Sequence, residues 1–108
     1  MQAVLQRVLH NIYMTQQSIQ QGIITMWPLW WEWELELTPH LLKRMEDRDF
    51  NEIDLRYMLQ NATDFEPDFL TGRWIINSKF KKYPWQIIVE PDELAQLLVV
   101  ITAYPIWD

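Results

Sequence analysis

The chain has 108 residues, 49% of them hydrophobic and 22% charged, a composition typical of one globular domain with a single core. Its net charge of −6 disfavours nonspecific binding to nucleic-acid phosphates, and the absence of cysteine excludes disulfides, thiolate metal sites and cysteine nucleophiles. No apolar run reaches the ~20 residues that a membrane span needs, so we predict a cytoplasmic protein that does not enter membranes.

Residues 2–20 predict an amphipathic helix, because apolar side chains recur at helical spacing while glutamines cover the other face. The recurring residues are Val4, Leu5, Val8, Leu9 and Ile12. Such a helix could pack on the domain, pair with a copy of itself, or be an extension created by an upstream start codon, since Met14 and Met26 are alternative starts. We therefore expect an N-terminal helical extension over residues 1–26 and a single domain over residues 27–108.

The segment from Trp30 to Leu37 predicts a strand, because apolar and acidic residues alternate strictly along it. The apolar positions are Trp31, Trp33, Leu35 and Leu37, and the residues between them are Glu32, Glu34 and Glu36. Three carboxylates on one face can bind a metal ion, but we favour an ordinary solvated sheet face. We therefore expect neither a metal site nor a cofactor.

Two capped helices follow this strand. Thr38 can cap the first helix and Pro39 suits its first turn, and we expect this helix to end near Arg48. Asn51 can cap the second, with Asp54 placed three residues later to support the cap. The residues expected to be buried are Leu41, Leu42 and Met45 in the first helix, and Ile53, Leu55, Met58, Leu59 and Ala62 in the second.

The remainder predicts an irregular link and three strands. The link covers residues 63–72, the strands cover residues 73–77, 84–89 and 97–104, and a turn covers residues 78–83. The last strand is continuously apolar, which is typical of a central strand covered on both faces. We predict an α+β fold in which two helices pack on one face of a small antiparallel sheet.

His40, Arg44 and Arg48 are spaced four residues apart, so they share one side of the first predicted helix. Phosphodiester chemistry needs a group that titrates near neutrality and donors for the charge that develops on the phosphate. Histidine and arginine supply these functions. The alternative is structural, with His40 as a surface or capping residue and both arginines paired with neighbouring acidic side chains.

Residues 69–89 carry four basic and no acidic side chains, which leaves a net charge of −10 on the rest of the chain. The candidate RNA-binding residues here are Lys79, Phe80, Lys81, Lys82 and Tyr83. Bases stack on aromatic rings and cations hold phosphates, so this mixture is typical of a site for single-stranded RNA. The alternative is a basic hairpin loop above an aromatic core, and the exposure of Phe80 and Tyr83 decides between the two.

Several segments resemble the domain-of-unknown-function 4258 family between residues 30 and 105. The matching residues are Thr38-Pro39-His40, Arg44-Met45, Asp47-Arg48, Asp54-Leu55, Leu59, Gly72-Arg73-Trp74, Trp85 to Glu90, and Leu98 to Tyr104. That family is similar to the BrnT-like and RelE-like toxins. The resemblance implies that this chain is a small α+β domain with helices before an antiparallel sheet. Residues 1–26 lie outside the resemblance.

The resemblance implies a metal-independent endoribonuclease in which the 2′-hydroxyl of RNA attacks the adjacent phosphate and leaves a cyclic phosphate end. The catalytic candidates by this analogy are His40, Arg44, Arg48 and Arg73, assisted by Lys79 or Lys81. His40 would be the general base or acid, and the arginines would bind the phosphate. We therefore predict that His40→Ala abolishes cleavage at little cost in stability.

The resemblance also implies a partner antitoxin. Because RelE-like toxins are usually basic and this chain is acidic, the alternative function is a nonenzymatic module that binds an antitoxin or another protein, or forms a homodimer. An exposed patch of Trp27, Trp30 and Trp31 would favour that module. A cleft that joins His40 and Arg44 to residues 79–82 would favour the ribonuclease.

Overall fold

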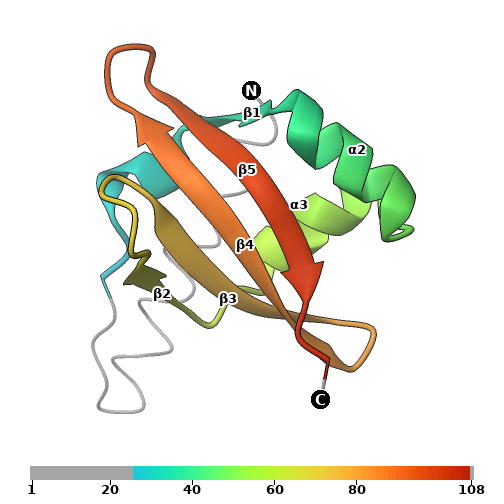
Figure 1. Ribbon diagram of the computed structural model, residues 1–108. Coiled ribbons are helices and arrows are strands. Elements are labelled where there is room, and N and C mark those ends of the chain that lie inside the picture. The colour runs from blue at the N-terminus through green and yellow to red at the C-terminus, as the bar shows by residue number, and fades with distance from the viewer. Residues whose placement is uncertain (1–25, 108) are drawn as a thin grey trace.

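The computed structural model describes residues 26–107, which form helices and one five-stranded sheet (Figure 1). The elements are a 3-10 helix η1 (Leu29–Glu32), strand β1 (Glu34–Leu37), helices α2 (Pro39–Asp47) and α3 (Glu52–Gln60), and strands β2 (Asp64–Pro67), β3 (Trp74–Phe80), β4 (Tyr83–Asp92) and β5 (Leu97–Pro105). The helix predicted over residues 2–20 lies outside the described residues. Within residues 26–107, no helix is long and apolar enough to cross a bilayer.

The strand order in the sheet is β1-β5-β4-β3-β2. Strands β2 to β5 pair in antiparallel fashion, whereas β1 runs parallel to β5, with Glu34 opposite Leu97 and Leu37 opposite Val100. The prediction of an α+β fold is confirmed, but the prediction of a purely antiparallel sheet is wrong. Strand β5 reaches β1 only after both helices and strands β2 to β4, so no hairpin turn dictates the relative direction of the two strands.

Three segments differ from the predicted strands. One is the predicted turn 78–83, because β3 runs to Phe80 and β4 begins at Tyr83, which leaves only Lys81 and Lys82 in the turn. The first half of the predicted strand 30–37 is the turn η1, in which the Trp31 amide donates to the Pro28 carbonyl at 3.0 Å and the Trp33 amide to the Trp30 carbonyl at 3.1 Å. This turn places the Trp31 indole in the core, where it is 1% exposed. The predicted irregular link 63–72 contains β2, a short edge strand in which Pro67 is tolerated.

Both predicted helix caps are confirmed. The Thr38 hydroxyl accepts from the Leu41 amide at 3.1 Å, and Asn51 and Asp54 form a reciprocal capping box with hydrogen bonds of 2.8 and 3.0 Å. The buried stripes are narrower than predicted, because Leu42 is 50% exposed and Ile53 is 77% exposed.

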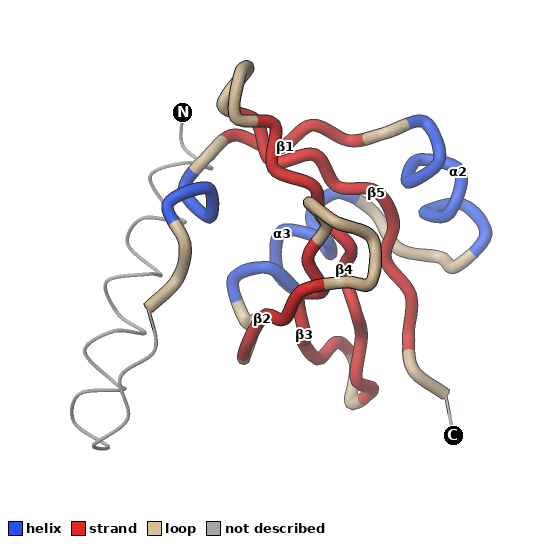
Figure 2. Tube along the Cα trace, turned by 60° about the vertical axis from the view of Figure 1, so that its left-hand side comes forward, coloured by secondary structure: helices blue, strands red, loops and turns tan. Residues whose placement is uncertain are grey.

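Helices α2 and α3 cover the same face of the sheet (Figure 2). The fully buried side chains between them and the sheet include Leu41, Leu55, Met58, Leu59, Ile76, Ile87, Val89, Leu98 and Val100. The Ser78 hydroxyl donates to the Met58 carbonyl at 2.6 Å and ties β3 to α3. Strand β5 alternates between buried and half-buried residues, so the prediction that it is covered on both faces is wrong for the described part of the chain.

Candidate nucleic-acid interface

The three predicted catalytic residues of α2 have different surroundings. His40 is exposed in the first turn, and no interaction with another residue of the described range 26–107 involves its side chain. Arg44 pairs with Asp47 on its own helix, with 2.8 Å between Nη1 and Oδ2. The Arg48 Nη1 donates to the Ala103 carbonyl of β5 at 3.0 Å. Of the three side chains, Arg48 is therefore the one that leaves the helix to meet the sheet.

Lys81 and Lys82 form the two-residue turn of the hairpin between β3 and β4, flanked by the pair Phe80 and Tyr83. Phe80 is half-buried and its ring meets the ring of Trp85 edge to face, with 5.9 Å between the centroids. Tyr83 is 49% exposed. The Lys81 ammonium lies 5.2 Å from the centroid of the Phe80 ring, a cation–π geometry. Phe80 therefore packs against the core, whereas Tyr83 lies at the surface, so the exposure criterion divides these two aromatic residues of the hairpin.

A pocket of about 370 Å³ lies between the C-terminal end of α2 and this hairpin. Its walls are formed by Asp47, Arg48, Asp49, Phe80, Lys81, Tyr83, Trp85, Pro105 and Trp107. Trp85 is 5% exposed and forms the floor, whereas Trp107 is 64% exposed and meets Tyr83 edge to face, with 4.6 Å between the ring centroids. The volume is in the range of small-molecule sites, and four of the nine lining residues are aromatic.

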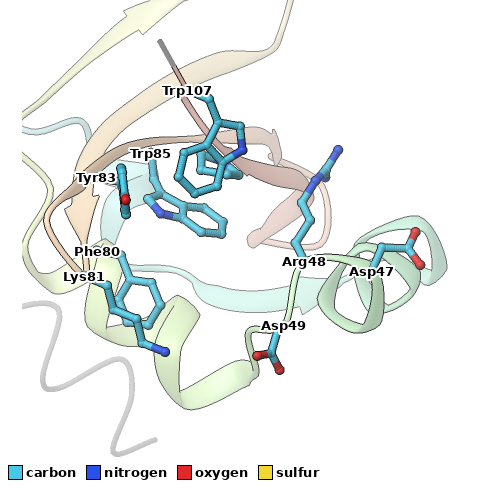
Figure 3. A pocket seen from close by; sticks show the side chains of 9 residues that line it. Asp47, Arg48, Asp49, Phe80, Lys81, Tyr83, Trp85 and Trp107 are labelled. Carbon is cyan, nitrogen blue, oxygen red and sulfur yellow. The ribbon is translucent and has the colours of Figure 1, made fainter.

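Charged side chains surround the opening of this pocket. Figure 3 shows the Arg48 and Lys81 side chains on opposite sides of it, with Asp49 at the rim between them. The Asp47 carboxylate is turned away and is held by Arg44. The Asp49 carboxylate forms no ion pair or hydrogen bond with any residue between 26 and 107. The pocket thus presents two cations and one free carboxylate around aromatic rings.

The structure brings together some predicted site residues and separates others. Arg48 lines the same pocket as Phe80, Lys81 and Tyr83. His40 lies eight residues before Arg48 on the same helix, which is about 12 Å along the helix axis. Arg73 precedes the far end of β3 and pairs with Glu90, with 3.4 Å between Nε and Oε1. Neither of these two residues lines the pocket.

The lysines next to Lys81 in the sequence do not line the pocket either. Lys79 and Lys82 are exposed and lie outside its walls. Within the part of the chain that the structure describes, no three His, Asp or Glu side chains group into a metal site.

The tryptophan-rich segment packs on the core, with Trp27 and Trp30 half-buried, and within residues 26–107 these tryptophans do not form an exposed patch. Trp31 is buried, and its ring lies 4.4 Å from that of Trp27 between centroids. Trp30 packs on Trp74 and Phe65 at centroid distances of 5.8 and 6.2 Å. The arrangement that would have favoured a docking module is absent from residues 26–107.

The face of the sheet opposite the helices carries a row of polar side chains across four strands. Tyr104 Oη donates to Gln86 Oε1 at 2.8 Å, Gln86 Nε2 donates to Asn77 Oδ1 at 3.2 Å, and Asn77 Nδ2 donates to Asp64 Oδ1 at 2.6 Å. Burial raises the pKa of the Tyr104 phenol, with a further contribution from the charge of Asp68, whereas the charge of Arg48 lowers it. The row is polar but contains no imidazole or lysine.

Asp49, Trp85 and Trp107 line the pocket but are not among the site residues predicted from the sequence. Trp107 reaches the pocket because the Ile106 amide donates to the Pro84 carbonyl at 2.8 Å, which folds the segment after β5 back onto the hairpin. No local sequence pattern predicts that hydrogen bond, because its two residues are far apart in the chain. The three comparisons, with family models, with curated proteins and with solved structures, found no match to this chain.

Proposed function

We propose that this protein is a toxin-like, metal-independent endoribonuclease that binds an unpaired segment of RNA at the pocket between α2 and the β3–β4 hairpin. The observation that supports the proposal is that Arg48 lines the same pocket as Lys81, Phe80 and Tyr83, although they come from two distant parts of the chain. Cations beside aromatic rings match the two surfaces of a single-stranded nucleotide, its charged phosphate and its flat base.

Arg48 and Lys81 are the residues that would bind the phosphate. The guanidinium of Arg48 has five N–H donors and uses one of them on the Ala103 carbonyl, so others remain for phosphate oxygens. Lys81 supplies a second positive charge from the opposite side of the pocket. Two opposed cations would stabilise the extra negative charge that develops when the ribose 2′-hydroxyl attacks the adjacent phosphorus.

In this reaction the bond from phosphorus to the 2′-oxygen forms as the bond to the 5′-oxygen breaks. The 2′-hydroxyl gives its proton to water, and water returns a proton to the departing 5′-oxygen, so the products are a 2′,3′-cyclic phosphate and a 5′-hydroxyl end. None of the pocket residues between 26 and 107 is a histidine, so their contribution would be electrostatic stabilisation and base positioning rather than proton transfer by histidine. Trp107 and Tyr83 are exposed beside the cations and would stack the bases that flank the phosphate.

The test is cleavage of a labelled mixed-sequence RNA by the full chain in EDTA, with the ends analysed for cyclic phosphate. Lys81→Asn should lower the rate by about ten-fold or more, because it removes a cation from the pocket. Lys82→Asn is the matched control, since it makes the same charge change at the next residue of the same turn but outside the pocket. Asparagine tolerates the left-handed backbone of both positions.

His40→Ala in the same assay shows whether cleavage takes place at the pocket or on the side of α2 that carries His40. If the pocket is the site, this variant keeps the wild-type rate, because His40 lies outside it. A loss of cleavage in His40→Ala with no loss in Lys81→Asn would move the chemistry to the exposed side of α2. Absence of cleavage by wild-type protein over a wide concentration range would contradict the proposed enzymatic activity.

A further inference from the structure

We propose that the pocket selects guanine, and that Asp49 reads the Watson–Crick edge of the base. This inference rests on the proposed RNA site and names the base that the site prefers. The two carboxylates of the pocket wall differ in their surroundings. Asp47 is neutralised by Arg44, whereas Asp49 has no ion pair or hydrogen-bond partner among residues 26–107.

The position of Asp49 follows from the way α2 ends. The Phe50 amide donates to the Met45 carbonyl at 3.1 Å, and Asp49 between them has a left-handed backbone with φ of 55°. This is the helix-ending geometry in which glycine is the usual residue. The turn carries the Asp49 side chain to the rim of the pocket, next to Arg48 and across from Phe80 (Figure 3).

A free carboxylate at this rim distinguishes the four bases by their hydrogen-bonding edges. Guanine presents two adjacent donors, N1–H and N2–H, which match the two oxygens of one carboxylate. Adenine and cytosine present one donor beside a ring-nitrogen acceptor, and uracil presents one donor between two carbonyl acceptors. Those acceptors face the negative charge of the carboxylate, so the same contact that attracts guanine repels the other three bases.

The aromatic rings and the cations of the pocket do not read the edge of the base, so this role falls to the Asp49 carboxylate. Phe80, Trp85 and Trp107 offer surfaces to a flat ring without regard to its identity. Arg48 and Lys81 are placed for the phosphate next to that base. Among the pocket residues, Asp49 is therefore the unpaired acceptor that can distinguish one base from another.

The test measures binding without cleavage. Fluorescein-labelled pentamers of sequence UUXUU, with X as each of the four bases and 2′-fluoro at every ribose, lack the hydroxyl nucleophile, so fluorescence anisotropy reports affinity alone. Wild-type protein should bind the guanine pentamer about ten-fold more tightly than the others, the size of discrimination expected of one bidentate contact. Asp49→Asn should reduce the guanine affinity to that of the other pentamers.

Two further variants complete the test. Glu46→Gln makes the same charge change on the exposed side of α2, outside the pocket, and should leave the preference intact. Asp49→Gly should also lose the preference while unfolding at a higher urea concentration than wild type, because glycine suits the left-handed position. A loss of selectivity in a more stable protein cannot result from unfolding.

The outcomes separate this inference from the function on which it rests. Equal affinity of wild-type protein for all four pentamers, or a guanine preference that survives in Asp49→Asn, would overturn the role of Asp49 while leaving the RNA site in place. Failure of every pentamer to bind would overturn both the guanine preference and the proposed RNA site.

Discussion

Lys81 and Lys82 both have a left-handed backbone, with φ of 51° and 73°. Two such residues in a two-residue hairpin define a turn that normally contains Asn-Gly, because other side chains crowd the backbone there. A non-glycine residue in this conformation costs roughly 1 kcal/mol. The protein therefore carries a less stable turn at the place where it presents cations beside the pocket.

Replacing Lys82 by glycine should stabilise the protein by about 0.5–1 kcal/mol, because glycine adopts this backbone without crowding. The measurement is urea unfolding followed by circular dichroism. Lys79→Gly is the control, since it places glycine inside β3, where the loss of a side chain should destabilise the protein by a similar amount. An unchanged or lower midpoint for Lys82→Gly would argue against the left-handed turn.

At the level of residues, the sequence predicted the composition of the pocket better than its location. Phe80, Lys81 and Tyr83 lie within one short segment, so their local mixture of charge and rings was visible. Arg48 was also identified, but as a member of a row with His40 that points elsewhere. Trp107 could not be found, because its place depends on a backbone hydrogen bond to Pro84, far from it in the sequence.

At the level of elements, helix α2 contacts the rest of the molecule through a narrow line of side chains. Leu41 is fully buried, whereas its neighbour Leu42 is 50% exposed. The helix is held at its start by Thr38, whose hydroxyl lies 3.1 Å from the carbonyl oxygens of Val100 and Ile101 in β5. It is held at its end by Arg48 on Ala103. Leu41, the half-buried Met45 and the hydrogen bonds of Thr38 and Arg48 to β5 thus set the position of the helix that brings Arg48 to the pocket.

The two leucines make a matched pair for measuring this packing. Leu41→Ala should destabilise the protein by about 2–5 kcal/mol, because it leaves a cavity between α2 and the sheet. Leu42→Ala makes the same chemical change at the surface and should alter stability by less than about 0.5 kcal/mol. Thermal or urea unfolding of both variants is the measurement, and similar losses in the two would contradict the orientation of α2.

Helix boundaries were predictable because their signals are local. Thr38 with Pro39, and Asn51 with Asp54, each place a cap and its partner within one helical turn. Strand pairing depends on residues far apart in the chain, and this is why the parallel partner of β5 and the short strand β2 were not predicted. The alternation of Trp31 and Trp33 with glutamate was a misleading local signal, because burial of an indole outweighed the extended pattern.

At the level of the whole molecule, the row from Tyr104 to Asp64 connects four of the five strands on the face away from the helices. Its members occupy paired positions, with Tyr104 opposite Gln86 and Asn77 opposite both Gln86 and Asp64. A slip of one residue in any pair would send these side chains to opposite faces. The row therefore specifies the register of the sheet.

The raised pKa of Tyr104 predicts that the free energy of unfolding falls at alkaline pH. A phenol whose folded pKa exceeds its ordinary value of 10.0 favours folding while it is neutral, and this contribution is lost as the pH rises above 10 toward the folded value. Tyr104→Phe should be less stable than wild type at pH 8, and the difference should shrink above pH 10. Urea unfolding at several pH values measures this, with Tyr57→Phe as an exposed control.

The contacts of α2 with β5 also determine whether a strand from another molecule can add to the sheet. Strand β1 pairs with residues 97–100 alone, so the backbone of β5 beyond that point would be an open edge without the side chains of Thr38 and Arg48. An open edge is a template on which another chain can add a strand and begin an aggregate. Loss of the Arg48 side chain would release the Ala103 carbonyl at that edge, so an Arg48→Ala variant would gain a tendency to polymerise.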